Sequence, residues 1–260
     1  MKIAISGKGG VGKSTIAGML AHVAAREGKR VLAVDADPDA NLAFALGVPE
    51  KDWSRIVPIS RQKELIEDRT GAKLKQAGQI FKLNPHVADI ADKYSYSFRG
   101  ISLLVLGAIE AGGTGCACPE NVFLRTLLSD ILLQRDECVI VDMEAGIEHL
   151  GRGTARGVDV LVVVTEPTRQ SIATARVIQQ LAGQIGLTRI CYIGNKIAAE
   201  TERLLLRRQL PDMAPMGFIP FHESIRRADT HGRTLIDHID DGLYNEFIAI
   251  YKKLDEIKGK

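Results

Sequence analysis

The segment GKGGVGKST, at residues 7–15, constrains the fold of this 260-residue chain more than any other feature. It follows the short apolar run KIAIS and precedes the amphipathic run IAGMLAHVAAREGK. Between a strand and a helix, the pattern G-x-x-x-x-G-K-[ST] is typical of a phosphate-binding loop, because its glycines let backbone N–H groups surround phosphate oxygens. We therefore expect nucleotide binding by Gly9, Gly10, Val11, Gly12, Lys13, Ser14 and Thr15.

The loop holds two lysines, and their positions predict different roles. Lys13 is placed to offer its charge to the terminal phosphates, and Ser14 is placed to ligate Mg²⁺. Lys8 lies on the opening arm, where a second ammonium at the same oxygens would be repelled by the first. Two interpretations of Lys8 stay open: a solvated surface residue, or a residue that reaches a nucleotide held by a second subunit. The second interpretation predicts a dimer.

The rest of the chain alternates apolar, β-branched runs with helical patterns. Seven such runs are predicted strands: KIAIS, RVLAVD, ISLLVLG, ECVIVD, DVLVVVT, RICYIG and MGFIPF. Continuous apolar strands separated by helices predict an α/β fold of the P-loop NTPase type, with a mostly parallel central sheet flanked by helices on both faces. We expect one domain over residues 1–260, with an insertion at about 49–100 where the alternation is lost.

Polar residues follow several of these predicted strands, at the edge where parallel sheets bind ligands. Asp142 ends a buried run, where a carboxylate can hold Mg²⁺ through water, and Asp35 is a weaker candidate for the same shell. Gly146 lacks a Cβ, so its N–H can approach a γ-phosphate. The segment around Gly146 is predicted to be a second switch. Glu148 and His149 either sense its movement or are ordinary surface residues.

Asn195 and Lys196 occupy the place where guanine-binding proteins carry N-K-x-D, but the fourth residue here is Ala198. Without that carboxylate the site has no acceptor for the guanine N1 and exocyclic amine. The sequence therefore favours adenine, and ATP over GTP.

Four segments carry a resemblance to a known family: GKGGVGKST, VLAVDADPDANLA, VIVDMEAGIEHLGRG and IPFHESIRRADTHGRTL. They resemble the deviant Walker A ATPases of the MinD, ParA and nitrogenase iron protein class, and within that class the CooC family. The resemblance implies that Lys8 reaches across an ATP-sandwich dimer, that Asp37 orients or deprotonates the attacking water, and that Asn195 contacts adenine. It also implies that the loop at Pro220 closes over the base.

Two of the four cysteines form a C-x-C pair, Cys116 and Cys118, in the glycine-rich segment GGTGCACPEN. Two thiolates underfill a four-coordinate metal site, whereas a symmetry axis through this segment would supply four. The other two, Cys138 and Cys191, lie in apolar runs and are expected to be small core residues. An S₄ site suits Zn²⁺ as well as Ni²⁺.

The CooC resemblance implies an ATP-hydrolysing metallochaperone that binds nickel at the dimer interface. It would assist nickel insertion into carbon monoxide dehydrogenase or a related nickel enzyme such as acetyl-CoA synthase. Two alternatives stay open, a positioning ATPase of MinD or ParA type and an electron-donating iron–sulfur ATPase. The iron–sulfur pattern of nitrogenase iron protein needs a cysteine in the second switch, and residues 143–152 contain none.

Composition argues against other partners. The net charge is +2 without a basic block, which disfavours nucleic acid. No apolar run approaches the ~20 residues that cross a bilayer, so we expect a cytoplasmic protein. A terminal run has helical spacing but a mixed-charge outer face, which favours packing against the domain over lipid binding: Leu243, Phe247, Ile250, Leu254 and Ile257.

Overall fold

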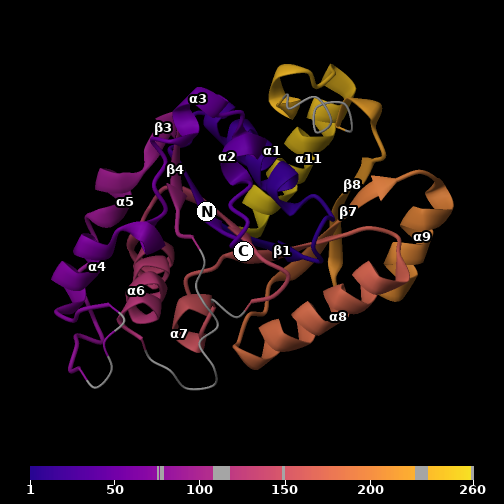
Figure 1. Cartoon of the computed structure of the whole chain (residues 1–260). Helices are drawn as coiled ribbons and strands as arrows, with labels where there is room; N and C mark the ends of the chain where they lie inside the picture. The colour runs from indigo at the N-terminus through magenta and orange to yellow at the C-terminus, as the bar shows by residue number, and fades with distance from the viewer. Residues whose placement is uncertain (75, 77–78, 108–117, 148–149, 226–233, 259–260) are drawn as a thin grey trace.

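The computed structural model describes residues 1–260 except 75, 77–78, 108–117, 148–149, 226–233 and 259–260. In the described residues eight strands form one sheet in the order β3-β4-β2-β5-β1-β6-β7-β8 (Figure 1). Their bounds are β1 Lys2–Gly7, β2 Val31–Ala36, β3 Tyr96–Phe98, β4 Ile101–Val105, β5 Cys138–Met143, β6 Val160–Thr165, β7 Ile190–Ile197 and β8 Ala214–Pro220. Among these eight described strands, only the β3–β4 pair is antiparallel. The predicted mostly parallel α/β sheet is confirmed.

Helices cover both faces of this sheet. Among the described residues they are α1 Lys13–Arg26, α2 Leu42–Leu46, α3 Glu50–Trp53, α4 Lys63–Thr70, α5 Ile90–Tyr94, α6 Pro119–Gln134, α7 Arg152–Ala155, α8 Arg169–Gln184, α9 Glu200–Gln209 and α11 Asp241–Lys258, with 3₁₀ turns η1 Ile59–Arg61 and η2 Leu235–Asp237. In Figure 1, α1, α2 and α11 lie on one side of the strands, and α6 and α8 lie on the other.

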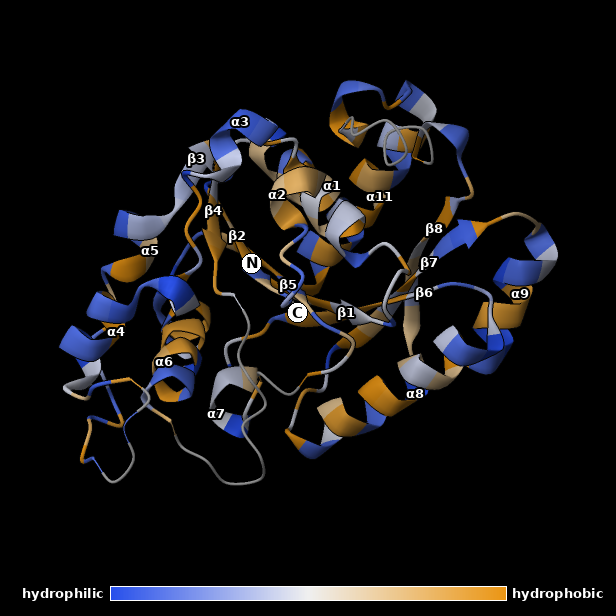
Figure 2. Ribbon diagram, in the orientation of Figure 1, coloured by the Kyte–Doolittle hydropathy of each residue, from blue (hydrophilic) through white to orange (hydrophobic). Residues whose placement is uncertain are grey.

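Alternation along the strands explains the two hydrophobic cores. In β1, Ile3 and Ile5 pack with residues of α1 and α11, whereas Ala4 between them packs with residues of α6 and α8. Successive strand side chains point to opposite faces, so a strand that is covered on both faces must be apolar throughout. Figure 2 shows this distribution, with apolar residues along the strands and polar residues on outer helices such as α4.

The order of the strands places the loop at 7–15 in the middle of the sheet. It follows β1, which lies between β5 and β6. The loops after β2 and β5 lie to one side of it, and the loops after β6, β7 and β8 lie to the other. Because these strands are parallel, their carboxyl ends share one edge.

The segment at 49–100 adds a strand that the sequence analysis missed. The alternation of strands and helices is lost at 49–100 in the sequence, yet Tyr96–Phe98 form β3 and pair antiparallel with β4. Arg99 and Gly100 connect the two strands with φ angles of 50° and 78°. Positive φ at both central residues is typical of a two-residue hairpin turn. The glycine of the Arg99-Gly100 pair is the sequence feature that could have indicated this turn.

The C-terminal helix packs as predicted. Leu243, Phe247, Ile250 and Leu254 of α11 are buried against α1 and β8. Among the described residues, no helix combines the length and the apolar character that a membrane span needs. The expected core cysteines are also confirmed, since Cys138 and Cys191 are buried and burial raises the pKa of both thiols.

Candidate nucleotide-binding site

The phosphate loop has a backbone that requires glycine at its two ends. Gly7 has φ 152°, and a Cβ there would lie 2.3 Å from the carbonyl oxygen of Val164. Gly12 has φ 94°, and a Cβ there would lie 2.5 Å from Nδ2 of Asn195. Gly12 precedes α1 without capping its N–H groups by a side chain. The start of α1 therefore keeps backbone donors and a positive dipole end for an anion.

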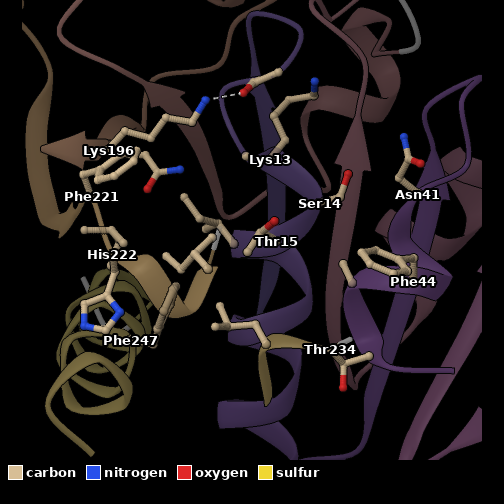
Figure 3. A pocket seen from close by; sticks show the side chains of 18 of the residues that line it. Lys13, Ser14, Thr15, Asn41, Phe44, Lys196, Phe221, His222, Thr234 and Phe247 are labelled. Carbon is tan, nitrogen blue, oxygen red and sulfur yellow. Dashed lines mark hydrogen bonds between the residues drawn. The ribbon is translucent and has the colours of Figure 1, made fainter. Parts of the chain in front are cut away.

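A cavity of about 580 Å³ opens at this loop, within the usual range for a small-molecule site (Figure 3). Ten of the predicted nucleotide-binding or catalytic residues line it: Gly9, Gly10, Gly12, Lys13, Ser14, Thr15, Asp37, Asn195, Lys196 and Pro220. Val11 is buried beneath the loop and does not line the cavity. Lys8 also stays outside the lining, in contrast to Lys13.

The lining includes side chains that the sequence analysis did not select. They lie in α2, at and after the end of β8, at the start of η2 and in α11: Phe44, Ala45, Ile219, Phe221, His222, Ile225, Thr234, Leu235 and Phe247. Figure 3 shows Lys13, Ser14 and Thr15 at the start of α1, with Lys196 and Phe221 to one side and Asn41 and Phe44 to the other. Most of these added residues are apolar, in contrast to the polar lining that the phosphate loop provides.

Lys13 and Asp37 face each other at the phosphate end. Their Nζ and Oδ2 atoms are 3.7 Å apart, and both side chains are largely buried. Asp37 in turn accepts a hydrogen bond from the backbone N–H of Asp39. Asp37 therefore presents its carboxylate to the cavity beside the lysine of the phosphate loop.

Asp35 and Asp142 form a second acidic feature deeper in the same edge. They are register partners at the ends of β2 and β5, and both are fully buried. Asp35 accepts hydrogen bonds from the backbone N–H groups of Asp37 and Leu42. Neither oxygen of Asp142 has a hydrogen-bond partner within the described residues.

Burial raises the pKa of both carboxyl groups to about 7. The neighbouring Asp35 carboxylate raises the pKa of Asp142 further, while Ser14 and Lys13 oppose the rise. A buried, unpartnered carboxylate is costly unless a cation compensates it. Asp142 and the Ser14 hydroxyl are oxygen donors of the kind that Mg²⁺ prefers, so the residues present fit a magnesium ion beside the phosphates.

The segment after β5 is hydrogen-bonded both to β1 and within itself at Gly146. The Ser6 hydroxyl donates to the carbonyl oxygen of Gly146 at 2.7 Å, and the Gly146 N–H donates to the carbonyl oxygen of Glu144 at 2.7 Å. The N–H of Gly146 is thus already engaged by a carbonyl group of its own segment. Glu148 and His149, the open switch candidates, lie outside the described residues.

The end of β7 contacts the phosphate loop directly. Nδ2 of Asn195 donates to the carbonyl oxygen of Val11 at 2.7 Å, and Nζ of Lys196 donates to that of Gly10 at 2.7 Å. Asn195 still lines the cavity, as does Pro220 at the end of β8. Phe221, next to Pro220, is 58% exposed at the cavity mouth.

Cys118 lies at the start of α6, where its Sγ accepts a hydrogen bond from the Asn121 N–H at 3.5 Å. The thiol is free and half-buried. Its predicted partner Cys116 lies outside the described residues. Among the residues that the structure does describe, no cluster of three or more His, Cys, Asp or Glu side chains could hold a metal ion.

Comparisons with known proteins agree with this geometry. The model of the CobQ/CobB/MinD/ParA nucleotide-binding domain matches residues 2–236. The carbon monoxide dehydrogenase accessory protein CooC of Rhodospirillum rubrum is 48% identical over 237 residues, which cover 91% of this chain and 90% of that protein. The chain belongs to the CooC group of this nucleotide-binding family.

Solved structures support the fold of this CooC-type chain. MinD in the MinC:MinD complex of Aquifex aeolicus has a TM-score of 0.69 at 20% identity, covering 98% of this chain and 95% of that one. MinD of Pyrococcus horikoshii, solved with Mg-ADP, has a TM-score of 0.64 at 22% identity, covering 99% and 96%. As a member of this family, the CooC-type chain is an ATPase that uses ATP with Mg²⁺.

Proposed function

We propose that this ATPase is a metallochaperone that carries nickel on Cys116 and Cys118 at a dimer interface and assists nickel insertion into carbon monoxide dehydrogenase. The observation that carries the proposal is the position of Cys118 on the nucleotide-binding edge. β4 and β5 both run parallel and flank β2 in the sheet, and α6 connects them. Cys118, the N-cap of α6, therefore lies toward the same edge as Asp35 and Asp37.

This placement gives a physical route from nucleotide to metal. A γ-phosphate at Lys13 meets the end of β2 and, through Gly146, the segment after β5. α7 follows that segment and packs against α6, so a shift of the segment would be passed to the helix that Cys118 caps. Nucleotide state would then alter the spacing of thiolates donated by two subunits, and metal affinity with it.

The dimer is supported by Lys8 and by the coordination chemistry. Lys8 does not line the cavity of its own chain, which leaves its ammonium available to a nucleotide across an interface. A pair of thiolates from each subunit completes the four ligands that Ni²⁺ or Zn²⁺ takes from sulfur. Carbon monoxide dehydrogenase is the proposed client because the relative at 48% identity bears that name.

The alternative of a membrane-positioning ATPase is less well supported. Its helix would have to present an apolar face to lipid. In α11 the apolar residues Leu243, Phe247, Ile250 and Leu254 are instead buried in the domain. The iron–sulfur alternative is less well supported because the pattern of nitrogenase iron protein takes a cysteine from the second switch, and residues 143–152 contain none.

Activation of nickel-free carbon monoxide dehydrogenase tests the proposal. The protein, Ni²⁺ and Mg-ATP are incubated with the apoenzyme, and CO oxidation is followed over time. We expect the wild type to raise the activation rate at limiting nickel, and both Lys13→Ala and Cys118→Ser to remove that rise. Cys138→Ser is the matched control, because this buried thiol has no assigned role. Activation by Cys118→Ser at the wild-type rate would refute the metal site.

A further inference from the structure

Two consecutive residues at the end of β7 donate hydrogen bonds to two consecutive carbonyl groups of the phosphate loop. Asn195 binds the carbonyl of Val11, and Lys196 binds the carbonyl of Gly10, each at 2.7 Å. Figure 3 draws the bond from Lys196 as a dashed line. Hence the ammonium of Lys196 is directed at the protein's own loop and not only at the cavity.

The backbone of Lys196 is bent to make this contact. It has φ 58°, a left-handed conformation that is uncommon for a residue with a side chain. The pairing of β7 with β8 also shifts register between Gly194 and Ile197. Local backbone strain of this kind persists only where surrounding contacts hold it, and it gathers at functional sites.

Glu166 is the second partner of Lys196. Its Oε2 lies 3.2 Å from the Lys196 ammonium, and its side chain is only 18% exposed. The first turn of α8 fixes the backbone of Glu166, because its N–H donates to the Ser171 hydroxyl at 3.1 Å. The Ser171 N–H in turn donates to Thr168 Oγ1. A carboxylate on an anchored backbone, largely buried, thus faces the Lys196 ammonium.

The opening arm of the phosphate loop, residues 8–10, is held by few contacts besides the one that Lys196 makes with Gly10. Gly9 and Gly10 are exposed, and a Cβ on either would meet nothing within 4 Å. Glycines without neighbours have a wide choice of backbone conformations. Within the arm, the Val11 N–H donates to the Lys8 carbonyl at a long 3.3 Å. An outside tether therefore decides where the arm lies.

We propose that Lys196 and Glu166 are positioning residues for ATP hydrolysis: together they hold the Gly10 carbonyl and so place the arm that carries Lys8. This role differs from the base contact that the N-K pattern suggests for Lys196. The part that concerns Lys8 rests on the proposed function, in which Lys8 acts across a dimer.

The first experiment separates positioning from nucleotide binding. Turnover of Mg-ATP and affinity for Mg-ADP are measured for Lys196→Met, Lys196→Arg and Glu166→Gln, without added nickel or client. We expect Lys196→Met to lower kcat about tenfold, the usual value of a charge-assisted hydrogen bond, while the Kd for ADP changes less than about threefold. Lys196→Arg should recover part of the loss, and Glu166→Gln should lower kcat about threefold.

Glu200→Gln is the matched control for Glu166→Gln. It removes the same charge from an ion pair with Arg203 on α9, which does not touch the phosphate loop. We expect wild-type turnover from this variant. Thermal unfolding of each variant checks that the fold is intact.

The second experiment is a double-mutant cycle with Lys8→Ala. If Lys196 acts through the arm, adding Lys196→Met to Lys8→Ala should lower kcat by less than about twofold, because the group that the arm presents is already gone. An ADP affinity that falls as far as kcat in Lys196→Met would overturn the proposal, since Lys196 would then be a direct nucleotide ligand. Where Lys8→Ala itself lowers kcat, losses that multiply in the double variant would overturn it as well. Equal turnover in Glu166→Gln and Glu200→Gln would also overturn it.

A Lys8→Ala variant with full turnover would remove the dimer role of Lys8 from the proposed function. The positioning role of the Lys196–Gly10 hydrogen bond would then still be tested by comparing the loss of kcat with the loss of ADP affinity in Lys196→Met. The two failures are thus distinguishable.

Discussion

Asp35 and Asp142 lie opposite each other on neighbouring parallel strands, with both carboxylates buried at the nucleotide-binding edge of the sheet. Asp35 satisfies its oxygens with two backbone N–H groups, whereas Asp142 has no hydrogen-bond partner in the described part of the chain. Two buried carboxyl groups this close raise each other's cost of ionisation. The ATPase thus holds a strained acidic pair that a divalent cation beside the phosphates would relieve.

Asp142→Asn should therefore stabilise the nucleotide-free protein while impairing hydrolysis. The folded pKa of Asp142 is about 7, above its ordinary value of 3.8. The native state then keeps a proton that the unfolded chain has lost, so stability falls as pH rises from about 4 to 7 and stays low above that. Removing this group should raise the free energy of unfolding by about 1–3 kcal/mol at pH 8.

Thermal unfolding of wild type and Asp142→Asn from pH 4 to pH 8, without nucleotide, measures this effect. The gain in Tm should grow with pH and level off above about pH 7. Mg²⁺-dependent turnover should fall at least about a hundredfold, since the ion loses its protein-side carboxylate. A variant less stable than wild type at pH 8 would contradict this account of the pair.

Lys13 and Asp37 form an ion pair at 3.7 Å, but their substitution by alanine should have different effects on ATP binding and on turnover. Lys13→Ala should weaken ATP binding and turnover together, because the phosphates lose their charge partner. Asp37→Ala should keep ATP binding and lose turnover at least about a hundredfold, because it removes only the group that orients water. Nucleotide titration beside single-turnover hydrolysis distinguishes the two, and equal loss of binding in both would remove Asp37 from its catalytic role.

Gly12→Ala and Gly9→Ala form a matched pair within one loop. An alanine Cβ at position 12 would lie 2.5 Å from Nδ2 of Asn195 at φ 94°, whereas at position 9 it would meet open space. We expect Gly12→Ala to lower the free energy of unfolding by about 1–3 kcal/mol and to weaken ADP binding at least about tenfold. Gly9→Ala should change both by little, as chemical denaturation and ADP titration can measure.

Lys8→Ala should leave nucleotide binding by the monomer intact and block ATP-induced dimerisation. The reason is that Lys8 stays outside the cavity of its own chain, so its proposed phosphate belongs to the other subunit. Gel filtration with light scattering, with Mg-ATP and the Asp37→Ala background to prevent turnover, measures the association. A Lys8→Ala protein that dimerises as fully as its parent would make Lys8 a solvated surface residue.

The sequence predicts most of the fold because its strands are buried on both faces. Runs such as ECVIVD and DVLVVVT are apolar throughout, and all seven predicted strands are present. β3 escaped prediction because it has three residues, lies at the sheet edge and is partly exposed. Its stability comes from pairing with β4 and from the Arg99-Gly100 turn, neither of which hydrophobic periodicity reports.

The residues of the nucleotide-binding site also fall into a group that the sequence predicts and a group that it does not. Residues of the phosphate loop and the strand ends were predictable, since a parallel sheet brings its carboxyl ends to one edge. Glu166, Phe221 and Thr234 were not, because their place at the site depends on how separate loops pack after folding. The bond of Lys196 to Gly10 was equally hidden, since it depends on a left-handed backbone at the end of β7.

The central claim is a nickel site shared between two subunits and coupled to nucleotide, and metal stoichiometry tests it most directly. Ni²⁺ binding is measured by equilibrium dialysis for wild type and Cys118→Ala, without nucleotide, with Mg-ADP and with a non-hydrolysable ATP analogue. The account predicts one Ni²⁺ per dimer, a different affinity in each nucleotide state, and collapse of binding in Cys118→Ala, which loses two of four ligands at once. One Ni²⁺ per chain in a monomer, or unchanged binding by Cys118→Ala, would contradict it.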